Sequence, residues 1–175
     1  NDKWKTYKFL TDNDFHAPMS FLDMNEVIEK ISEGKLSYPI VVKPRYGCGS
    51  ISVAIAYDEE DLRYLTKKAN EDIANSYLKY ESSVTTDKVI YQECLKGQEY
   101  GADIINDLTG KTQNVIVRKK LAMRSGETDI AQLVDEQNIK ETLVRLGKTT
   151  KHIANMDCDI FMVNGIPYIL EMNDR

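Results

Sequence analysis

The chain has 175 residues, enough for one ordinary domain or for two small lobes packed together. Apolar residues make up 42% and charged residues 29% of the sequence, a composition typical of a globular protein with a substantial core. Because 23 Lys and Arg stand against 28 Asp and Glu, with a net charge of −5 and no basic block, we expect no nucleic-acid-binding surface.

Helices and strands alternate in the first half of the chain. Apolar periodicity, β-branched runs and helix-capping residues predict three helices, at 2–10, 25–32 and 58–69, and two strands, at 38–44 and 51–57. Two glycines between the strands predict a loop at 45–50. Residues 70–86 are polar and fit no element clearly.

Strands predominate in the second half. The same criteria predict strands at 89–93, 100–105, 114–121, 160–163 and 168–172, and one long helix at 136–154 with an apolar stripe that includes Ile153. Helices mixed with antiparallel strands in this order predict an α+β architecture with two lobes.

The strand that ends at Lys43 and the loop after it form the first candidate site. The lysine ammonium can bind phosphate oxygens, and Gly47 and Gly49 let backbone N–H groups approach the same ligand. The segment is not a Walker loop, because the lysine precedes the glycines and no helix follows directly. The alternative is a surface hairpin with an exposed lysine.

The second candidate is the segment from Tyr91 to Glu99. A strand that leaves the sheet here could offer backbone groups to an adenine edge, with Leu95 packed on the base. Glu99 could accept hydrogen bonds from ribose hydroxyls. The alternative is an edge strand with solvated acids.

The densest polar motif lies at 171–175, with Asp159 before it. In a strand, Glu171 and Asn173 share a face because they are two residues apart. With a third oxygen donor from Asp159, they suit Mg²⁺ that also holds nucleotide phosphates. Arg175 would face the same anionic cluster. The alternative is an edge strand with solvated polar groups.

The turn at Asn164–Gly165 decides whether these ligands converge. A two-residue turn would pair Asp159 with Leu170 and direct its carboxylate away from that of Glu171. A three-residue loop with Gly165 in a left-handed bulge would pair Asp159 with Ile169 and put both carboxylates on one face. The metal hypothesis therefore predicts the three-residue loop.

Cysteines and histidines offer no competing site. Cys48, Cys94 and Cys158 are odd in number and widely spaced, as expected of reduced thiols in a cytoplasmic protein. The two histidines lie far from any recognisable partner. No apolar run has membrane-spanning length, so we expect no signal peptide and no membrane association.

In order and spacing, the three motifs resemble those of the ATP-grasp superfamily, and most closely its branch that includes the carbamoyl-phosphate synthase large subunit. The resemblance runs from the helix at residue 2 to Arg175. The segments 39–50, 92–99 and 171–175 look like the lid strand and loop, the adenine and ribose segment, and the metal-binding strand. That strand usually ends Glu-x-Asn-Pro-Arg in the family, and here Asp174 replaces the proline.

The resemblance implies a role for each matching position. The implied nucleotide and metal contacts are Lys3, Lys43, Gly47, Gly49 and Ser50 for phosphates; Glu93 and Leu95 for adenine; Glu99 for ribose; and Asp159, Glu171 and Asn173 for the metal. Lys43, Arg118 and Arg175 would be the catalytic cations, and Lys120 lies on the same basic strand as Arg118. The implied cofactors are ATP and Mg²⁺, which Mn²⁺ could replace.

The implied fold is an ATP-grasp fold, two α+β lobes with the nucleotide cleft between them. Residues 1–18 would be a linker helix from a missing N-terminal domain, 19–91 the lid lobe, and 92–175 the metal-binding lobe, truncated at its C-terminus. The partners would be a small-molecule carboxylate, an amine or ammonia, and the missing flanking domains of the same chain.

The implied activity is that of an ATP-dependent carbon–nitrogen ligase, in which a carboxylate attacks the γ-phosphate and an amine or ammonia then displaces phosphate. Such chemistry depends on positioning and charge neutralisation more than on a general base. The fragment alone could be inactive. Two alternatives remain: a nucleotide-binding module without catalysis, which would bind ATP without releasing ADP, and a structural α+β domain that binds no nucleotide.

Overall fold

The computed structural model describes residues 2–47, 52–124 and 126–175. The chain divides into two compact units, one formed by Asn1–Tyr7 and Pro18–Cys94, the other by Lys8–Ala17 and Leu95–Arg175. Helix α1 (Lys3–Asp12) contributes residues to both. Among the described residues, no helix has the length and apolarity required to cross a lipid bilayer.

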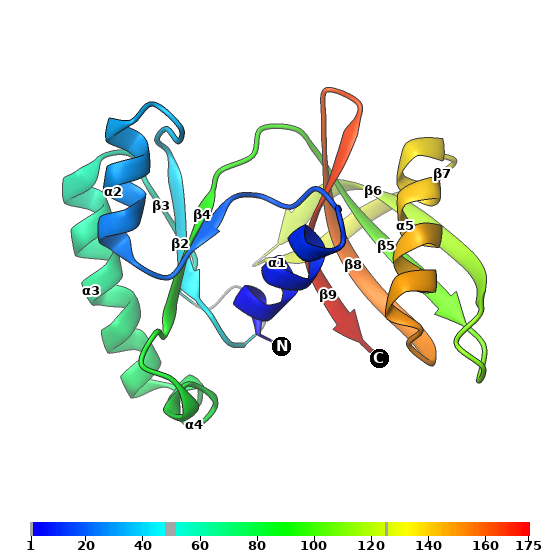
Figure 1. Cartoon of the computed structure of the whole chain (residues 1–175), viewed down its shortest axis with the longest axis horizontal. Coiled ribbons are helices and arrows are strands. Elements are labelled where there is room, and N and C mark those ends of the chain that lie inside the picture. The colour runs from blue at the N-terminus through cyan, green and yellow to red at the C-terminus, as the bar shows by residue number, and fades with distance from the viewer. Residues whose placement is uncertain (1, 48–51, 125) are drawn as a thin grey trace. The chain divides into compact units, whose positions relative to one another are not determined.

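The first unit contains a four-stranded antiparallel sheet in the order β1-β4-β2-β3. Its elements are β1 (Ser20–Phe21), α2 (Met24–Ser32), β2 (Ile40–Pro44), β3 (Ala54–Ala56), α3 (Glu59–Asn75), α4 (Leu78–Glu81), a 3₁₀ turn (Ser82–Val84) and β4 (Val89–Glu93). Helices α2 and α3 lie on one side of this sheet (Figure 1). As predicted, Asp58 caps α3, since its carboxylate accepts a hydrogen bond from Asp61 N–H at 2.8 Å.

Alternation along β2 separates an apolar face from the candidate site. Ile40 and Val42 are fully buried in the core that α2 and α3 cover. Lys43 therefore points to the opposite face of the sheet, where it pairs with Ile90 of β4.

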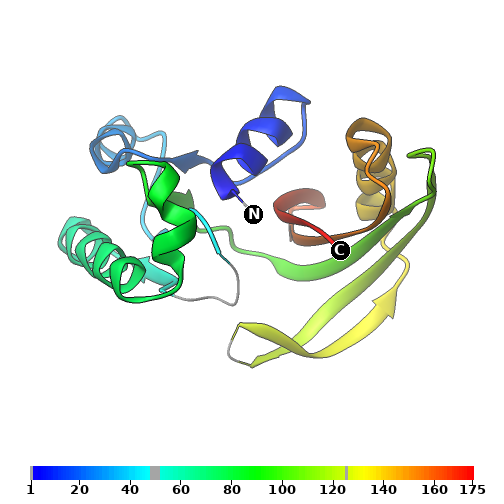
Figure 2. The same cartoon turned by 90° about the horizontal axis from the view of Figure 1, so that it is seen from below.

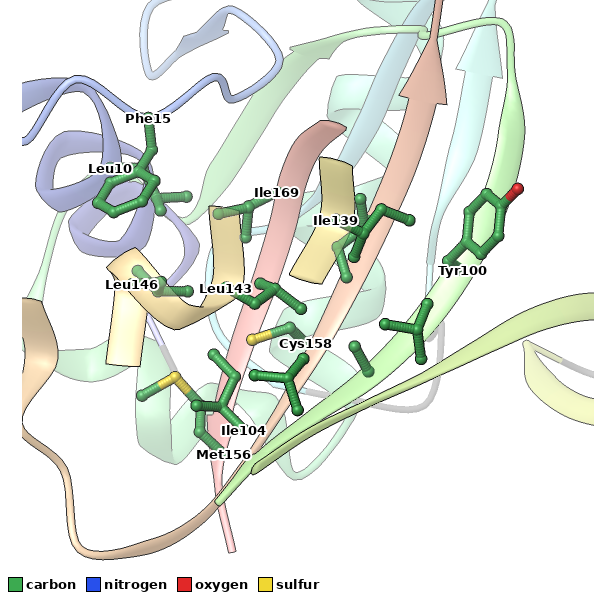
Figure 3. Packing of buried hydrophobic residues seen from close by; sticks show 14 residues of the cluster. Leu10, Phe15, Tyr100, Ile104, Ile139, Leu143, Leu146, Met156, Cys158 and Ile169 are labelled. Atoms are coloured by element: carbon green, nitrogen blue, oxygen red, sulfur yellow. The ribbon is translucent and has the colours of Figure 1, made fainter. Parts of the chain in front are cut away.

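The second unit contains a five-stranded antiparallel sheet in the order β7-β6-β5-β8-β9. Its strands and helix are β5 (Gln98–Asn106), β6 (Thr112–Arg124), β7 (Glu127–Val134), α5 (Gln137–Thr150), β8 (Ala154–Val163) and β9 (Ile166–Asp174). Helix α5 lies on one side of the sheet (Figure 2) and packs Ile139, Leu143 and Leu146 against it (Figure 3). Leu10 and Phe15 join this core from the N-terminal segment. The other face of the sheet remains available for polar side chains.

Several elements differ from those predicted, and three of the differences have a clear physical cause. Strand β7 was not predicted, because its side chains are exposed on both faces and show no alternation. Helix α5 ends at Thr150 and not at residue 154, since Lys151 adopts a left-handed conformation with φ 51° and β8 begins at Ala154. Ile153 consequently lies outside the helix and is exposed. In the polar stretch 70–86, α3 continues to Asn75 and α4 follows.

Candidate nucleotide and metal site

The lysines predicted to bind phosphate are buried in the first unit. Lys43 and Lys3 keep only 6% and 7% of their surface exposed, which excludes the alternative of an exposed hairpin lysine at position 43. Lys3 Nζ donates a 2.7 Å hydrogen bond to the carbonyl of Gly47. Gly47 has a φ of 97°, and a Cβ there would lie 2.3 Å from Leu78 Cδ2, so only glycine fits. Gly49 and Ser50 lie outside the described residues.

An ion pair between Asp2 and Arg45 anchors α1 to the end of β2. Both carboxylate oxygens of Asp2 accept hydrogen bonds from the Arg45 guanidinium at 2.8 Å, and the backbone N–H of Lys3 donates to the Arg45 carbonyl at 3.1 Å. Burial alone would raise the pKa of Asp2, but the hydrogen bonds from Arg45 and from backbone N–H groups outweigh it and hold the pKa below its usual range. Lys3 and Lys43 are thus held beside a rigid, charge-paired junction.

Glu93 is held at the end of β4. Its backbone N–H donates to the Met19 carbonyl at 2.8 Å, and its Oε2 accepts from Met19 N–H at 3.2 Å. Leu95 is the first residue of the second unit after β4. The adenine contacts of Glu93 and Leu95 remain a prediction.

The face of the second sheet opposite α5 carries a grid of charged side chains in register. Asp159 of β8 pairs with Gly101 of β5 on one side and with Glu171 of β9 on the other. In the next row, Asp157 pairs with Asp103 and with Asn173. Because residues paired across strands share a face, the three predicted metal ligands lie on the same face, at the β8–β9 edge. Strand β9 is indeed an edge strand.

The prediction that a three-residue turn brings Asp159 and Glu171 together is wrong. Val163 pairs with Ile166, so Asn164–Gly165 is a two-residue turn, and its φ values of 50° and 80° are those of a type I′ hairpin. The register shifts instead within the strands, where Ile160 pairs with Ile169 and Asp159 with Glu171. Leu170 is the extra residue of a β-bulge, and this bulge restores the shared face.

Lys120 of β6 connects two residues with different predicted roles. Its Nζ lies 2.6 Å from Oε1 of Glu99, the expected ribose contact, and 2.6 Å from Oδ1 of Asp159, an expected metal ligand. Burial of the ammonium opposes its charge, but the hydrogen bonds to Asp159 and Glu99 outweigh burial and raise the pKa of Lys120.

The two arginines of the predicted site pair with acids of the second row. Arg118 hydrogen-bonds Asp103 and lies 3.6 Å from Asp157, and Arg175 NH2 lies 3.2 Å from Asp157 Oδ2. Asn155 Nδ2 also donates to Asp103 at 3.0 Å. Burial tends to raise the pKa of Asp103, but the hydrogen bonds from Arg118 and Asn155 lower it overall.

The donor set at the β8–β9 edge fits magnesium. Asp159, Glu171 and Asn173 offer only oxygen atoms of two carboxylates and one amide, and Mg²⁺ prefers a few such ligands while keeping waters and phosphates. Within the described ranges, no group of three or more His, Cys, Asp or Glu side chains is arranged to hold a metal ion. A metal here would therefore depend on the amide and on a bound nucleotide to complete its ligands.

The cysteines and histidines have structural surroundings. Cys94 and Cys158 are free thiols, while Cys48 lies outside the described residues. Burial raises the pKa of the Cys158 thiol, which keeps it protonated in the core. His152 lies 3.1 Å from the Ile104 carbonyl through Nε2 and 2.8 Å from Thr150 Oγ1 through Nδ1, at the end of α5.

Sequence motifs alone did not identify Lys120 as a bridge or Asp103 and Asp157 as arginine partners. Their proximity follows from strand order, since β6, β5 and β8 are adjacent in the sheet. The register that brings Lys120 beside Glu99 also depends on a bulge, since Asn106 pairs with Thr112 but Ile105 pairs with Asn114.

Comparison with known proteins identifies the family. The model of the ATP-grasp domain matches residues 1–175. D-alanine–D-alanine ligase B of Clostridium perfringens is 26% identical over 98% of this chain and 51% of its own length. The carbamoyl phosphate synthase large chain of Beutenbergia cavernae is 34% identical over 54% of this chain and 7% of its own length.

A solved structure shares the fold. The biotin carboxylase domain of Hydrogenobacter thermophilus 2-oxoglutarate carboxylase, in complex with MgADP and bicarbonate, superposes with a TM-score of 0.78 at 17% identity, over 99% of this chain and 39% of that one. The chain thus spans about half or less of each of these three proteins. Its two antiparallel sheets with helices match the predicted α+β class, and the chain belongs to the ATP-grasp family.

Proposed function

We propose that this chain is the nucleotide-binding core of an ATP-dependent carbon–nitrogen ligase that activates a carboxylate as an acyl phosphate. The observation that carries the proposal is the bulge at Leu170, which puts Asp159 opposite Glu171 in a chain matched along its whole length by the ATP-grasp model. A polar edge strand without a ligand role would not require these oxygen donors to share a face. A cytoplasmic location, where ATP is abundant, is part of the proposal.

The chain's own residues would bind and orient the reactants. Lys3 and Lys43 would hold phosphate oxygens, and Arg175 would meet the charge that develops on the transferred group. Asp159, Glu171 and Asn173 would hold Mg²⁺, which when bound neutralises phosphate charge. A carboxylate oxygen would bond to the γ-phosphorus as the bond to the ADP oxygen breaks. The nitrogen would then attack the acyl carbon, lose a proton and expel phosphate.

The branch of the family is the finer part of the proposal. We favour a carbamoyl-phosphate-synthase-like reaction, because the identity to that large chain is the higher of the two, at 34% over 94 residues. The D-alanine–D-alanine ligase matches at 26% identity over nearly the whole chain. A ligation of two organic substrates is therefore the alternative reaction. The substrates of the first reaction would be bicarbonate and ammonia. Those of the second would be two amino acids.

A nucleotide-binding module without catalysis is the second candidate. Two features favour it: Asp174 adds a negative charge beside the metal strand, and Arg175, the expected catalytic cation, is paired with Asp157. Such a module would bind Mg-ATP as tightly as an enzyme does. It would release no ADP with any carboxylate and amine.

The proposal is tested by nucleotide binding and by ATP consumption of the intact protein. We expect Mg²⁺-dependent ATP binding in calorimetry, weakened about tenfold or more in Glu171→Gln and in Lys43→Met. Lys67→Met and Glu127→Gln remove exposed charges of the same kinds and should bind ATP like the wild type. ADP release with bicarbonate and ammonia would support the carbamoyl-phosphate-synthase-like reaction. ADP release with amino acids alone would instead support the ligation of two organic substrates.

Two results would contradict the proposal. A wild-type protein that does not bind ATP in the presence of Mg²⁺ excludes both candidates and leaves a structural domain. Tight Mg-ATP binding with no ADP release across the panel of carboxylates and amines would favour the non-catalytic module.

A further inference from the structure

Two carboxylates from different strands share the ammonium of Lys120. It is 2.6 Å from Glu99 of β5 and 2.6 Å from Asp159 of β8. Its side chain is 9% exposed, against 27% and 31% for the two acids. The lysine is therefore the most enclosed member of the three.

A glycine opens the path that Lys120 takes across the sheet. Glu99 is on the strand next to Lys120, but Asp159 lies one strand further, and Gly101 of β5 pairs with Asp159 between them. A Cβ on Gly101 would lie 3.6 Å from Lys120 Cε, in contact with the lysine stem. Any longer side chain would fill the passage. The Lys120–Asp159 contact thus depends on a small residue at position 101.

We propose that Lys120 is a positioning residue whose ammonium holds Asp159 and Glu99 in place before Mg²⁺ and nucleotide bind. The inference rests on the proposed function, since Asp159 is the proposed metal ligand and Glu99 the proposed ribose contact. Without this ammonium, the carboxylates of Glu99 and Asp159 would face each other with uncompensated negative charge.

Metal and ammonium compete for the same carboxylate. Mg²⁺ binds carboxylate oxygens at roughly 2.0–2.1 Å, and a second positive charge 2.6 Å from that oxygen repels it at short range. We therefore expect the Lys120–Asp159 hydrogen bond to loosen when metal binds to the same carboxylate. A nucleotide phosphate offers the displaced ammonium a new anionic partner, so metal and nucleotide should each strengthen the binding of the other.

Mn²⁺ binding in the absence and presence of ATP tests this role. In the wild type, we expect weak Mn²⁺ binding without nucleotide and a strong increase with ATP. Lys120→Met removes the charge and keeps much of the stem, so it should bind Mn²⁺ alone about fivefold more tightly and lose most of the increase. Lys119→Met changes the adjacent lysine, on the other face of β6, and should behave like the wild type.

Two further variants separate charge from folding. Lys120→Arg keeps the cation and should restore weak binding of Mn²⁺ alone, and Lys120→Gln provides a second neutral side chain if the methionine variant does not fold. Neutral variants that fold, by circular dichroism, yet bind Mn²⁺ alone no more tightly than the wild type would overturn the inference while leaving the proposed function intact. A wild type that binds no metal, with or without ATP, would overturn both.

Discussion

The two units hold their charged residues in different ways. In the first unit, Lys3, Lys43 and Arg45 each keep less than a tenth of their surface exposed and are fixed by a helix start and a strand end. In the second unit, Asp103 and Asp159 lie on an open sheet face, with 18% and 31% of their side chains exposed. There the charged residues are held mainly by one another.

This difference predicts different consequences of mutation. A charge buried among backbone and helix contacts cannot lose its partner without a cost to folding, because water does not replace the partner. A partly exposed grid can be rearranged at lower cost, since solvent and neighbouring charges compensate. The first unit thus supplies rigid cations, and the second a network that a ligand can reorganise.

The largest expected effect is on the buried pair of the first unit. Arg45→Met leaves the Asp2 carboxylate without its guanidinium partner in a nearly buried site, where both side chains are 10% exposed. We expect a loss of about 3 kcal/mol in the free energy of unfolding, measured by urea denaturation. The matched control is Arg63→Met, which breaks an exposed pair with Glu59 and should cost about 0.3–0.5 kcal/mol.

A double variant sharpens this test. Adding Asp2→Asn to Arg45→Met removes the stranded charge and should recover part of the lost stability. If Arg45→Met and Arg63→Met lower the free energy of unfolding equally, the buried Asp2–Arg45 pair stabilises the fold no more than an exposed ion pair on a helix does.

A smaller effect is expected for Asp103 of the second unit, and it depends on pH. Because the folded-state pKa of Asp103 is lowered, its ionised form stabilises the fold above the unfolded pKa of about 3.9, and this contribution is lost as pH falls through the folded pKa. Asp103→Asn should cost about 1.5 kcal/mol at pH 7 and flatten the loss of stability below pH 4. Denaturant midpoints between pH 2 and 7 provide the measurement.

Asp12 offers a control for that pH dependence. Its carboxylate is 63% exposed and lies 3.4 Å from Lys8 within α1. Asp12→Asn should change the unfolding free energy by less than about 0.5 kcal/mol at every pH. An acid transition of Asp103→Asn that matches the wild type would mean that Arg118 does not hold this carboxylate in solution.

Most of the fold could be predicted from local signals in the sequence. The proline-bounded strand before Lys43, the Asp58 cap and the apolar stripe of α5 are each contained in a few neighbouring residues. Strand β7 could not be predicted in this way, because it is held by pairing with β6 and not by an apolar face. The end of α5 was missed because a lysine, and not a glycine, adopts the left-handed cap.

The candidate site was less predictable than the fold. Its residue types could be identified from the motifs, but the face on which each side chain lies depends on strand register. One extra residue at Leu170 reverses the orientation that the turn alone would give to Glu171. The contact of Lys120 with Asp159 spans three strands, and no local spacing encodes it.

The smallest expected effect separates the turn from the bulge in the second unit. A Cβ on Gly165 would meet no atom within 4 Å, so only the φ of 80° should destabilise Gly165→Ala, by about 1 kcal/mol. Asn164→Gly should change the stability very little. Thermal unfolding and Mg-ATP calorimetry on both variants make the comparison. If the bulge at Leu170 sets the shared face of Asp159 and Glu171, nucleotide affinity should survive the lost stability. A parallel fall in affinity would instead assign control of the site to the turn.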